Sequence, residues 1–153
     1  MSKTIITYGT FDMFHIGHLR LFKRMRELGE RVIVAVSTDE FNAQKGKRAL
    51  IPYAERREIL EALSCVDLVI EESSWEQKVT DIQRYGVDVF VMGDDWRGRF
   101  DELRVFCEVV YLERTEGISS SELKQALGRL IEAQRTQASG DLEMIEGLHR
   151  SLL

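Results

Sequence analysis

The chain has 153 residues, of which 31% are charged and 44% hydrophobic, and its formal net charge is −5. This length suits one domain with a sizeable core, and the acidic balance argues against a nucleic-acid partner. We find no apolar run long enough to span a membrane and no room for a signal peptide before the first strand, so we expect a cytoplasmic protein with no membrane partner. Cys65 and Cys107 are expected as reduced, buried thiols.

Strands and helices alternate in the predicted chain. Apolar runs predict strands, and apolar residues at helical spacing predict the helices between them. The expected strands are residues 4–8, 31–37, 68–70, 87–92 and 109–112, and the expected helices are residues 18–28, 53–63, 75–85 and a short one after Asp101. This alternation predicts an α/β fold with a Rossmann-like, doubly wound, five-stranded parallel sheet in a single domain with C-terminal helices.

The C-terminal part is expected to be helical. Ser119 and Glu122 form a capping box that opens a helix, and Ala138-Ser139-Gly140 interrupts its pattern before a last short amphipathic helix begins at Asp141. We therefore predict a main domain at residues 1–130 and a helical extension at residues 131–153. The extension is expected to pack on its own domain or on a second copy.

The turn from the first strand to the first helix is the clearest candidate site. It reads YGTFDMFHIGH over residues 8–18, and it places free backbone N–H groups and the positive end of a helix dipole at the carboxyl edge of the sheet. His15 and His18 share one face of the first helical turn, and Gly17 between them leaves room for a ligand. We interpret this turn as a phosphate site. Zinc is disfavoured because no third ligand stands at a suitable spacing, and histidines bonded only to nearby carbonyls are the non-functional alternative.

Two further segments bring polar groups to the same edge. Lys45 and Lys47 lie in a loop after the second strand, whereas the cations of the first helix are interpreted as a solvated outer face. Residues 114–121, RTEGISSS, join the last strand to the capped helix and aim N–H groups, hydroxyls and Arg114 at this edge. Serines used only as caps would explain Ser119 but not Arg114, so we favour ligand binding.

These motifs resemble the signatures of a known enzyme superfamily. GTFD followed by HIGH resembles the first signature of the nucleotidyltransferase superfamily, and RTEGISSS resembles its second. From Lys3 to about Lys124 the chain resembles the cytidylyltransferase family, in particular its members that act on glycerol 3-phosphate. The matching runs are VAVSTDEFN at 34–42, KGK at 45–47, PYAERREILEAL at 52–63 and VMGDDW at 91–96. Two departures are Ser64, where the family has arginine, and Ser121, where threonine is usual.

The resemblance implies a reaction and its partners. It implies transfer of CMP from CTP to sn-glycerol 3-phosphate, giving CDP-glycerol and pyrophosphate for teichoic-acid-like or capsular polymers. Mg²⁺ would be bound mainly through the CTP phosphates, and the protein would be a homodimer. Other acceptors (phosphoethanolamine, phosphocholine or a sugar phosphate), ATP in place of CTP, and a regulatory module without turnover stay open as alternatives.

The resemblance also assigns roles to residues. It makes His15, His18, Arg114 and Lys45 the catalytic groups, and Lys45 and Lys78 the contacts to the acceptor phosphate. The residues assigned to CTP are Thr10, Phe11, His15, Ile16, Gly17, His18, Lys47, Asp94, Arg114, Thr115, Glu116, Gly117, Ile118, Ser119, Ser120 and Ser121. Asp39 and Asp94 follow predicted strands and can reach a ligand there. The protonation of the histidines stays open, because a helix N-terminus lowers a histidine pKa and phosphates raise it.

Overall fold

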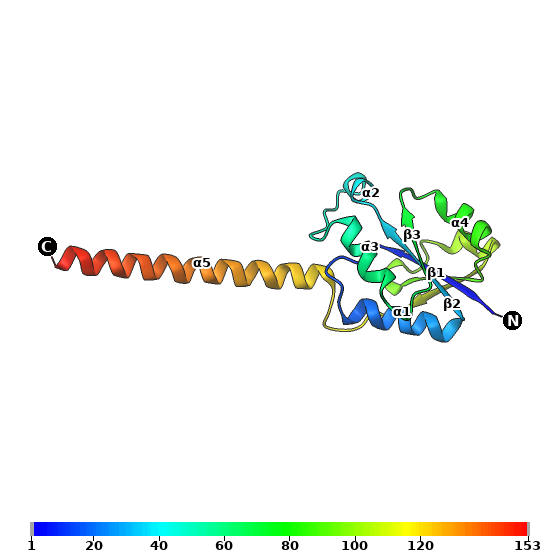
Figure 1. The fold of residues 1–153 in the computed structure, drawn as a ribbon, viewed down its shortest axis with the longest axis horizontal. Coiled ribbons are helices and arrows are strands. Elements are labelled where there is room, and N and C mark those ends of the chain that lie inside the picture. Colours follow the sequence, from blue (N-terminus) through cyan, green and yellow to red (C-terminus); the bar gives the residue numbers. More distant parts are fainter. Residues whose placement is uncertain (1, 153) are drawn as a thin grey trace. The chain divides into compact units, whose positions relative to one another are not determined.

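The computed structural model describes residues 2–152 and confirms the alternation of strands and helices (Figure 1). The strands are β1 (Thr4–Gly9), β2 (Arg31–Ser37), β3 (Leu68–Glu72), β4 (Val89–Gly93) and β5 (Glu108–Leu112). The helices are α1 (Ile16–Leu28), α2 (Asp39–Gln44), α3 (Tyr53–Glu61), α4 (Gln77–Tyr85) and α5 (Ser120–Ser151), with short 3₁₀ helices η1 (Asp94–Trp96) and η2 (Asp101–Val105).

The sheet has five parallel strands in the order β3-β2-β1-β4-β5. This arrangement confirms the predicted doubly wound α/β fold. The strand order reverses direction between β1 and β4, and ligands of such sheets bind beyond the carboxyl ends of the strands at this point. The loops after β1 and β4 therefore flank the expected binding crevice.

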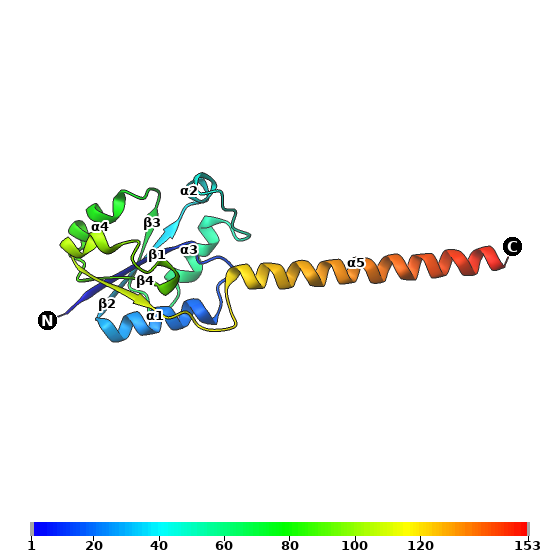
Figure 2. The ribbon, with the colours of Figure 1, turned by 180° about the vertical axis from the view of Figure 1, so that it is seen from behind.

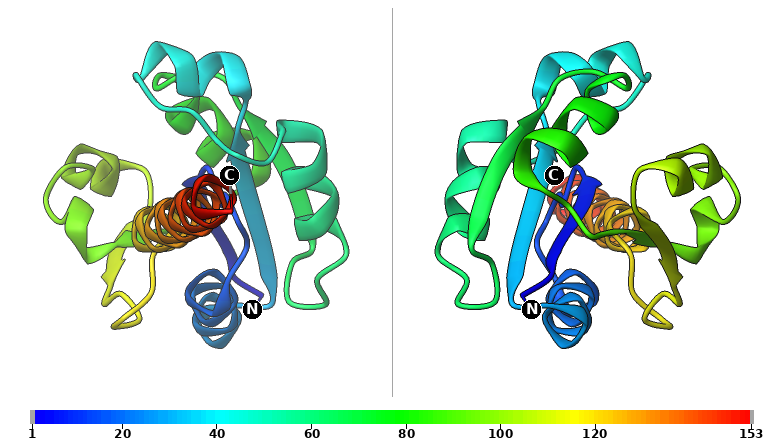
Figure 3. Two further views of the ribbon diagram at one scale, coloured as in Figure 1. Left: turned by 90° about the vertical axis from the view of Figure 1, so that its left-hand side faces the viewer. Right: turned by 90° about the vertical axis from the view of Figure 1, so that its right-hand side faces the viewer.

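Both faces of the sheet are covered, which explains why the strands read as continuous apolar runs. On one face, Phe22 and Met25 of α1 and Leu60 of α3 pack on the side chains of the inner strands. On the other face, Ile82 of α4 and Leu103 of η2 complete a second core cluster. Figures 2 and 3 show these layers from behind and from the two sides.

The helix α2 was not predicted, because six residues are too few to show a helical period. Thr38 caps it by accepting a hydrogen bond from the backbone N–H of Phe41 at 3.0 Å. The side chains of Phe41 and Asn42 are buried. This short helix carries the chain from β2 to Lys45, so it sets where the predicted lysine loop begins.

The chain divides into two compact units, residues 1–118 and 119–153, which we describe separately. In the second unit α5 runs without a break from Ser120 to Ser151, so the predicted interruption at Ala138-Ser139-Gly140 is wrong. Serine and glycine inside a helix cost roughly 0.5–1 kcal/mol each relative to alanine, which the surrounding helix-forming residues offset. The predicted boundary between residues 130 and 131 falls inside this helix and stays a prediction. No helix within residues 2–152 is long and apolar enough to cross a membrane.

Candidate functional site

The loop after β1 has an unusual and firmly held backbone. Phe11 and Met13 have positive φ angles of 53° and 54°, a conformation that costs side-chain-bearing residues energy and persists only where contacts impose it. Between them, the carboxylate of Asp12 accepts hydrogen bonds from the backbone N–H groups of Leu50 at 2.8 Å and Ile51 at 3.0 Å. The loop that leads to the histidines is thus tied to the segment before α3.

A buried arginine that the sequence analysis did not single out completes this frame. Arg56 on α3 is only 1% exposed, and its guanidinium donates to the carbonyl oxygens of Thr10, Ser37 and Ile51, each at 2.8 Å. It also pairs with the carboxylate of Asp39 at 2.9 Å. Arg56 therefore joins the ends of β1 and β2. Its only signal in the sequence was its place in the PYAERREILEAL run.

His15 and His18 stack on each other, with ring centroids 3.8 Å apart. Nδ1 of His15 accepts a hydrogen bond from the backbone N–H of Gly17 at 3.0 Å, and Nδ1 of His18 accepts one from the N–H of His15 at 3.3 Å. A backbone N–H can only donate, so both Nδ1 atoms are acceptors, and in the neutral rings the proton lies on Nε2. Each imidazole therefore offers one N–H donor to a ligand.

Both rings are neutral near pH 7. Burial, followed by the neighbouring His15 ring, lowers the pKa of His18 to about 3. Burial and the positive charge of Arg114 lower the pKa of His15. Nε2 of His15 is buried and lacks a hydrogen-bond partner among residues 2–152. A buried donor without a partner costs about 1–3 kcal/mol, so this atom is suited to meet a ligand acceptor.

The second motif reaches the same helix start. A Cβ placed on Gly17 would lie 2.8 Å from Cε1 of His15 and 3.4 Å from Cγ2 of Ile118. A Cβ at this position would collide with the His15 imidazole, so the folded loop requires glycine here. Arg114 is near enough to influence His15 and lies 3.9 Å from the Asp95 carboxylate. Residues 114–118 and the histidine pair are therefore neighbours within the first unit.

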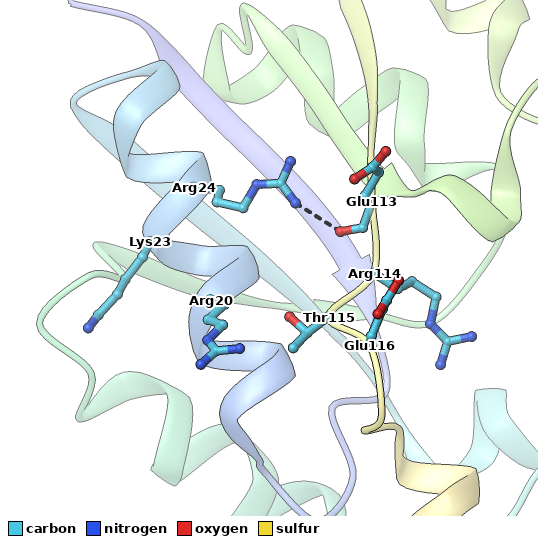
Figure 4. Close-up of a pocket in the computed structure, with 7 residues that line it drawn as sticks. All are labelled: Arg20, Lys23, Arg24, Glu113, Arg114, Thr115 and Glu116. Atoms are coloured by element: carbon cyan, nitrogen blue, oxygen red, sulfur yellow. Dashed lines mark hydrogen bonds between the residues drawn. The ribbon is translucent and has the colours of Figure 1, made fainter.

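The cations of α1 are more than a solvated face. Arg20, Lys23 and Arg24 line a cavity of about 480 Å³ together with Glu113, Arg114, Thr115 and Glu116 (Figure 4). Arg24 donates a hydrogen bond to the carbonyl oxygen of Glu113 at 2.8 Å, and the side chain of Arg114 points away from α1. Arg24 of α1 thus helps to hold the segment that carries Arg114.

The two lysines predicted to contact the acceptor share one carboxylate. Lys78 of α4 pairs with Oε2 of Glu72 at 2.9 Å, and Lys45 lies 3.9 Å from Oε1. Ser37 links the group, because its hydroxyl donates to Glu72 at 2.5 Å and accepts from Lys45 at 3.2 Å. Glu72 is 3% exposed and Lys78 is 4% exposed. We call Lys45, Lys78 and Glu72 the lysine cluster.

Aromatic rings surround the lysine cluster. The ammonium groups of Lys45 and Lys78 lie 5.5 Å and 4.8 Å from the ring centroid of Trp75, and Lys47 lies 5.9 Å from that of Trp96. Cations over aromatic faces are stabilised by the ring quadrupole. Burial lowers the pKa of Lys45, an effect that Glu72 opposes. The cluster therefore holds charge in a largely apolar setting.

The other predicted residues fall around this frame. Thr10 donates to Oδ1 of Asn42 at 2.9 Å, and the Asn42 amide nitrogen is buried without a hydrogen-bond partner among residues 2–152. Asp94 opens η1 directly after β4. Ser119 caps α5 by accepting from the N–H of Glu122 at 3.1 Å. Ser119, Ser120 and Ser121 belong to the second unit, so their predicted contacts to CTP stay predictions.

Ser64, which stands where the family has arginine, lies away from the candidate site residues. Ser64 is exposed in the turn between α3 and β3, at the amino end of β3. The histidines, the lysine cluster and Arg114 all follow the carboxyl ends of strands. The missing family arginine is therefore at the opposite edge of the sheet.

Comparisons with known proteins identify the family of the chain. The model of the cytidylyltransferase-like family matches residues 6–126. The chain is 55% identical over 128 residues to a glycerol-3-phosphate cytidylyltransferase of Bacillus subtilis, covering 84% of this chain and 99% of the relative. It is 54% identical over 125 residues to the protein of that name from Staphylococcus aureus, covering 82% of this chain and 95% of the relative.

A solved structure supports the fold. The lipopolysaccharide core biosynthesis protein from Thermoplasma volcanium superposes with a TM-score of 0.64 at 19% identity, covering 76% of this chain and 100% of the other. At this identity the likeness concerns the fold alone. With the family model spanning the histidine turn, the lysine cluster and the Arg114 segment, the chain belongs to the cytidylyltransferase-like family.

Proposed function

We propose that this chain is a nucleotidyltransferase that transfers CMP from CTP to sn-glycerol 3-phosphate, with CDP-glycerol and pyrophosphate as products. The buried, unpartnered Nε2 of His15 is the observation that carries a catalytic role, because it sits beside a second donor at a helix start. The identity of more than half of the aligned residues with relatives named for this reaction supports the two substrates.

The reaction needs positioning more than proton transfer. An oxygen of the acceptor phosphate attacks the α-phosphorus of CTP, the new P–O bond forms, and the bond to the β-phosphate breaks with its electron pair leaving on pyrophosphate. Negative charge grows on the oxygens around the α-phosphorus and on the leaving group. N–H donors fixed before the reaction stabilise that charge without reorganising. Nε2–H of His15 and His18 would serve here, and neither ring would act as a general base.

The acceptor end would use the lysine cluster. Two ammonium groups and one carboxylate leave a net positive charge, which attracts a phosphate dianion. In the described part of the chain, Ser37 is the one residue that accepts a hydrogen bond from the Lys45 ammonium group. The other N–H groups of this ammonium can therefore donate to a ligand. We propose that Lys45 contacts the acceptor phosphate, while Lys78, buried against Glu72, fixes the cluster beneath it. Arg114 and Lys47 would contact the CTP phosphates.

Mg²⁺ fits this proposal as a companion of CTP. The groups gathered at the helix start are N–H donors, which bind phosphate oxygens rather than a metal ion, so the ion would be held by the triphosphate itself. When bound, it would neutralise phosphate charge and orient the leaving group. A role in teichoic-acid-like or capsular polymer synthesis, a cytoplasmic location and a homodimer are further parts of the proposal.

Pyrophosphate release provides the test. The purified protein is incubated with each of the four common nucleoside triphosphates and with glycerol 3-phosphate, phosphoethanolamine, phosphocholine or a sugar phosphate, with and without Mg²⁺. We expect release with CTP, glycerol 3-phosphate and Mg²⁺ to exceed every other combination. Faster release with another acceptor or with ATP would mean that this compound is the substrate. If no pair of substrates gives release, the enzymatic role is refuted.

A further inference from the structure

The helix α5 carries exposed apolar side chains on one face in both its halves. It has 32 residues, none of them buried, and is therefore about 48 Å long at 1.5 Å per residue. Its larger apolar side chains fall in two groups, residues 123–131 and 142–152, whose helical spacing places them on one face. They are Leu123, Leu127, Leu130, Ile131, Leu142, Ile145, Leu148 and Leu152. We call this set, with Ala138 at its middle, the α5 stripe.

A helix of this kind needs a partner. Leu130, Ile145 and Leu148 are 62%, 59% and 59% exposed, and most of the stability of an amphipathic helix comes from packing its apolar face. The family model ends at residue 126, so most of the stripe lies beyond the part of the chain that the family shares. The α5 stripe is therefore expected to have a function separate from the proposed reaction.

The order of the residues suits a second copy running in the opposite direction. In an antiparallel pair centred between Gln137 and Ala138, Leu123 faces the partner's Leu152. Leu127 then faces the partner's Leu148, and Leu130 faces the partner's Ile145. In each case the two residue numbers have the same sum, so one register brings all these pairs together. Ala138 lies near the centre of this face, where its small side chain lets the two backbones approach.

Charge selects the antiparallel over the parallel pair. In the same register Asp141, which lies on the same face of α5 as the α5 stripe, faces the amide of the partner's Gln134, whereas a parallel pair would place two Asp141 carboxylates together. The first half of α5 has three basic and two acidic residues, and the second half has one basic and three acidic ones. These are Lys124, Arg129, Arg135, Glu122 and Glu132 in the first half, and Arg150, Asp141, Glu143 and Glu146 in the second. Opposite halves therefore attract.

The same charges argue against a membrane surface as the occupant. Helices that lie on anionic membranes have polar faces rich in lysine and arginine. Over Ser120–Ser151 the acidic residues outnumber the basic ones by five to four. We propose that α5 is an antiparallel pairing helix, through which two copies of this chain associate.

Light scattering on the full-length chain tests the association. Ile145→Glu places a carboxylate in the stripe, and Thr136→Glu places the same group on the opposite face. We expect Thr136→Glu to keep the wild-type mass and Ile145→Glu to halve it, with association weakened roughly a hundredfold or more, because the two-fold axis repeats the loss in both copies. If residues 1–118 form a second interface, the wild-type chain is a tetramer and Ile145→Glu has the mass of a dimer. Equal masses for all three proteins would refute the proposal.

Engineered cysteines test the direction. Leu130 and Ile145 are 15 residues and about 22 Å apart on one helix, which is too far for a disulfide. In an antiparallel pair, Leu130→Cys and Ile145→Cys chains form a disulfide-linked dimer when mixed and oxidised, but not when oxidised separately. The wild-type chain gives the background from Cys65 and Cys107. Crosslinking of each variant with itself would indicate a parallel pair, and vesicle binding lost in Ile145→Glu at unchanged mass would indicate a membrane; either result overturns the proposal.

Discussion

The histidine pair and the lysine cluster occupy the same edge of the sheet but present different groups to a ligand. At the histidine pair, burial lowers the pKa values, so both rings are neutral and each presents a single N–H. In the lysine cluster, the Glu72 carboxylate lies 2.9 Å from the Lys78 ammonium and 3.9 Å from that of Lys45, and it opposes the burial that lowers the pKa of Lys45. The histidine pair thus offers neutral N–H donors to a ligand, whereas the lysine cluster offers positive charge.

This difference matches the proposed substrates. A triphosphate arrives with Mg²⁺ already bound, so a site around its α-phosphorus gains most from donors that need no reorganisation as charge moves. A small phosphorylated alcohol brings a dianion without a metal ion, and it is bound best by fixed positive charge. The comparison therefore predicts that changes at the histidines affect turnover and changes at Lys45 affect acceptor binding.

The largest effect is expected from His18→Ala, which removes one of the two neutral donors. Turnover should fall roughly 10²- to 10³-fold, as is usual when one donor to a developing negative charge is lost. CTP should still bind, because Arg114, Lys47 and the helix start remain. Steady-state turnover and CTP binding by calorimetry separate the two quantities. Unchanged turnover would remove His18 from the mechanism.

Lys78→Met should act on stability. It leaves the Glu72 carboxylate, which is 3% exposed, without its closest cation, and breaking a buried ion pair in this way costs about 3 kcal/mol. Urea unfolding measures the loss. Adding Glu72→Gln to Lys78→Met removes the unpaired charge and should restore most of the stability. A double variant no more stable than Lys78→Met would contradict the pairing.

Lys45→Met should raise the Michaelis constant for glycerol 3-phosphate by about 10- to 100-fold, the effect of one lost charge-assisted hydrogen bond. Methionine keeps most of the length of the side chain and can still pack against the aromatic rings. The Michaelis constant for CTP should change little. Lys23→Met, on the outer face of α1, is the matched control and should leave the acceptor constant at its wild-type value. An effect of Lys45→Met confined to CTP would mean that this lysine serves the nucleotide.

Much of this arrangement could be predicted from the sequence, because it depends on local patterns. Apolar runs located all five strands, and the spacing of His15 and His18 placed both rings on one helical turn. The meeting of Arg114 with the histidines followed from topology, since the carboxyl ends of parallel strands share one edge of the sheet. The family signatures then supplied candidate roles that position alone could not.

Other features depend on contacts between distant residues and had no local signal. Arg56 reads as one more charged residue of an amphipathic helix, yet it is buried and bonded to three carbonyl groups. Glu72 closes a strand, and nothing near it in the sequence shows that Lys45 and Lys78 converge on it. The helix α5 was predicted to break at glycine and serine, because propensity was weighed without the continuity of the stripe on both sides.

The neutral state of the buried His18 also required the structure, and it leads to the smallest predicted effect. Burial lowers the pKa of His18 to about 3 in the folded protein, below the ordinary value of 6.5 that applies when the chain is unfolded. As the pH falls from 7.5 to 5, the unfolded chain therefore takes up a proton that the folded protein does not, and stability decreases. The loss due to His18 at pH 5 should be about 1–2 kcal/mol. His18→Gln keeps an N–H donor but cannot be protonated, so its urea midpoint should fall less between these pH values than that of the wild type. Equal pH dependence in the two proteins would mean that His18 is not held neutral by burial, and the contrast with the lysine cluster would be lost.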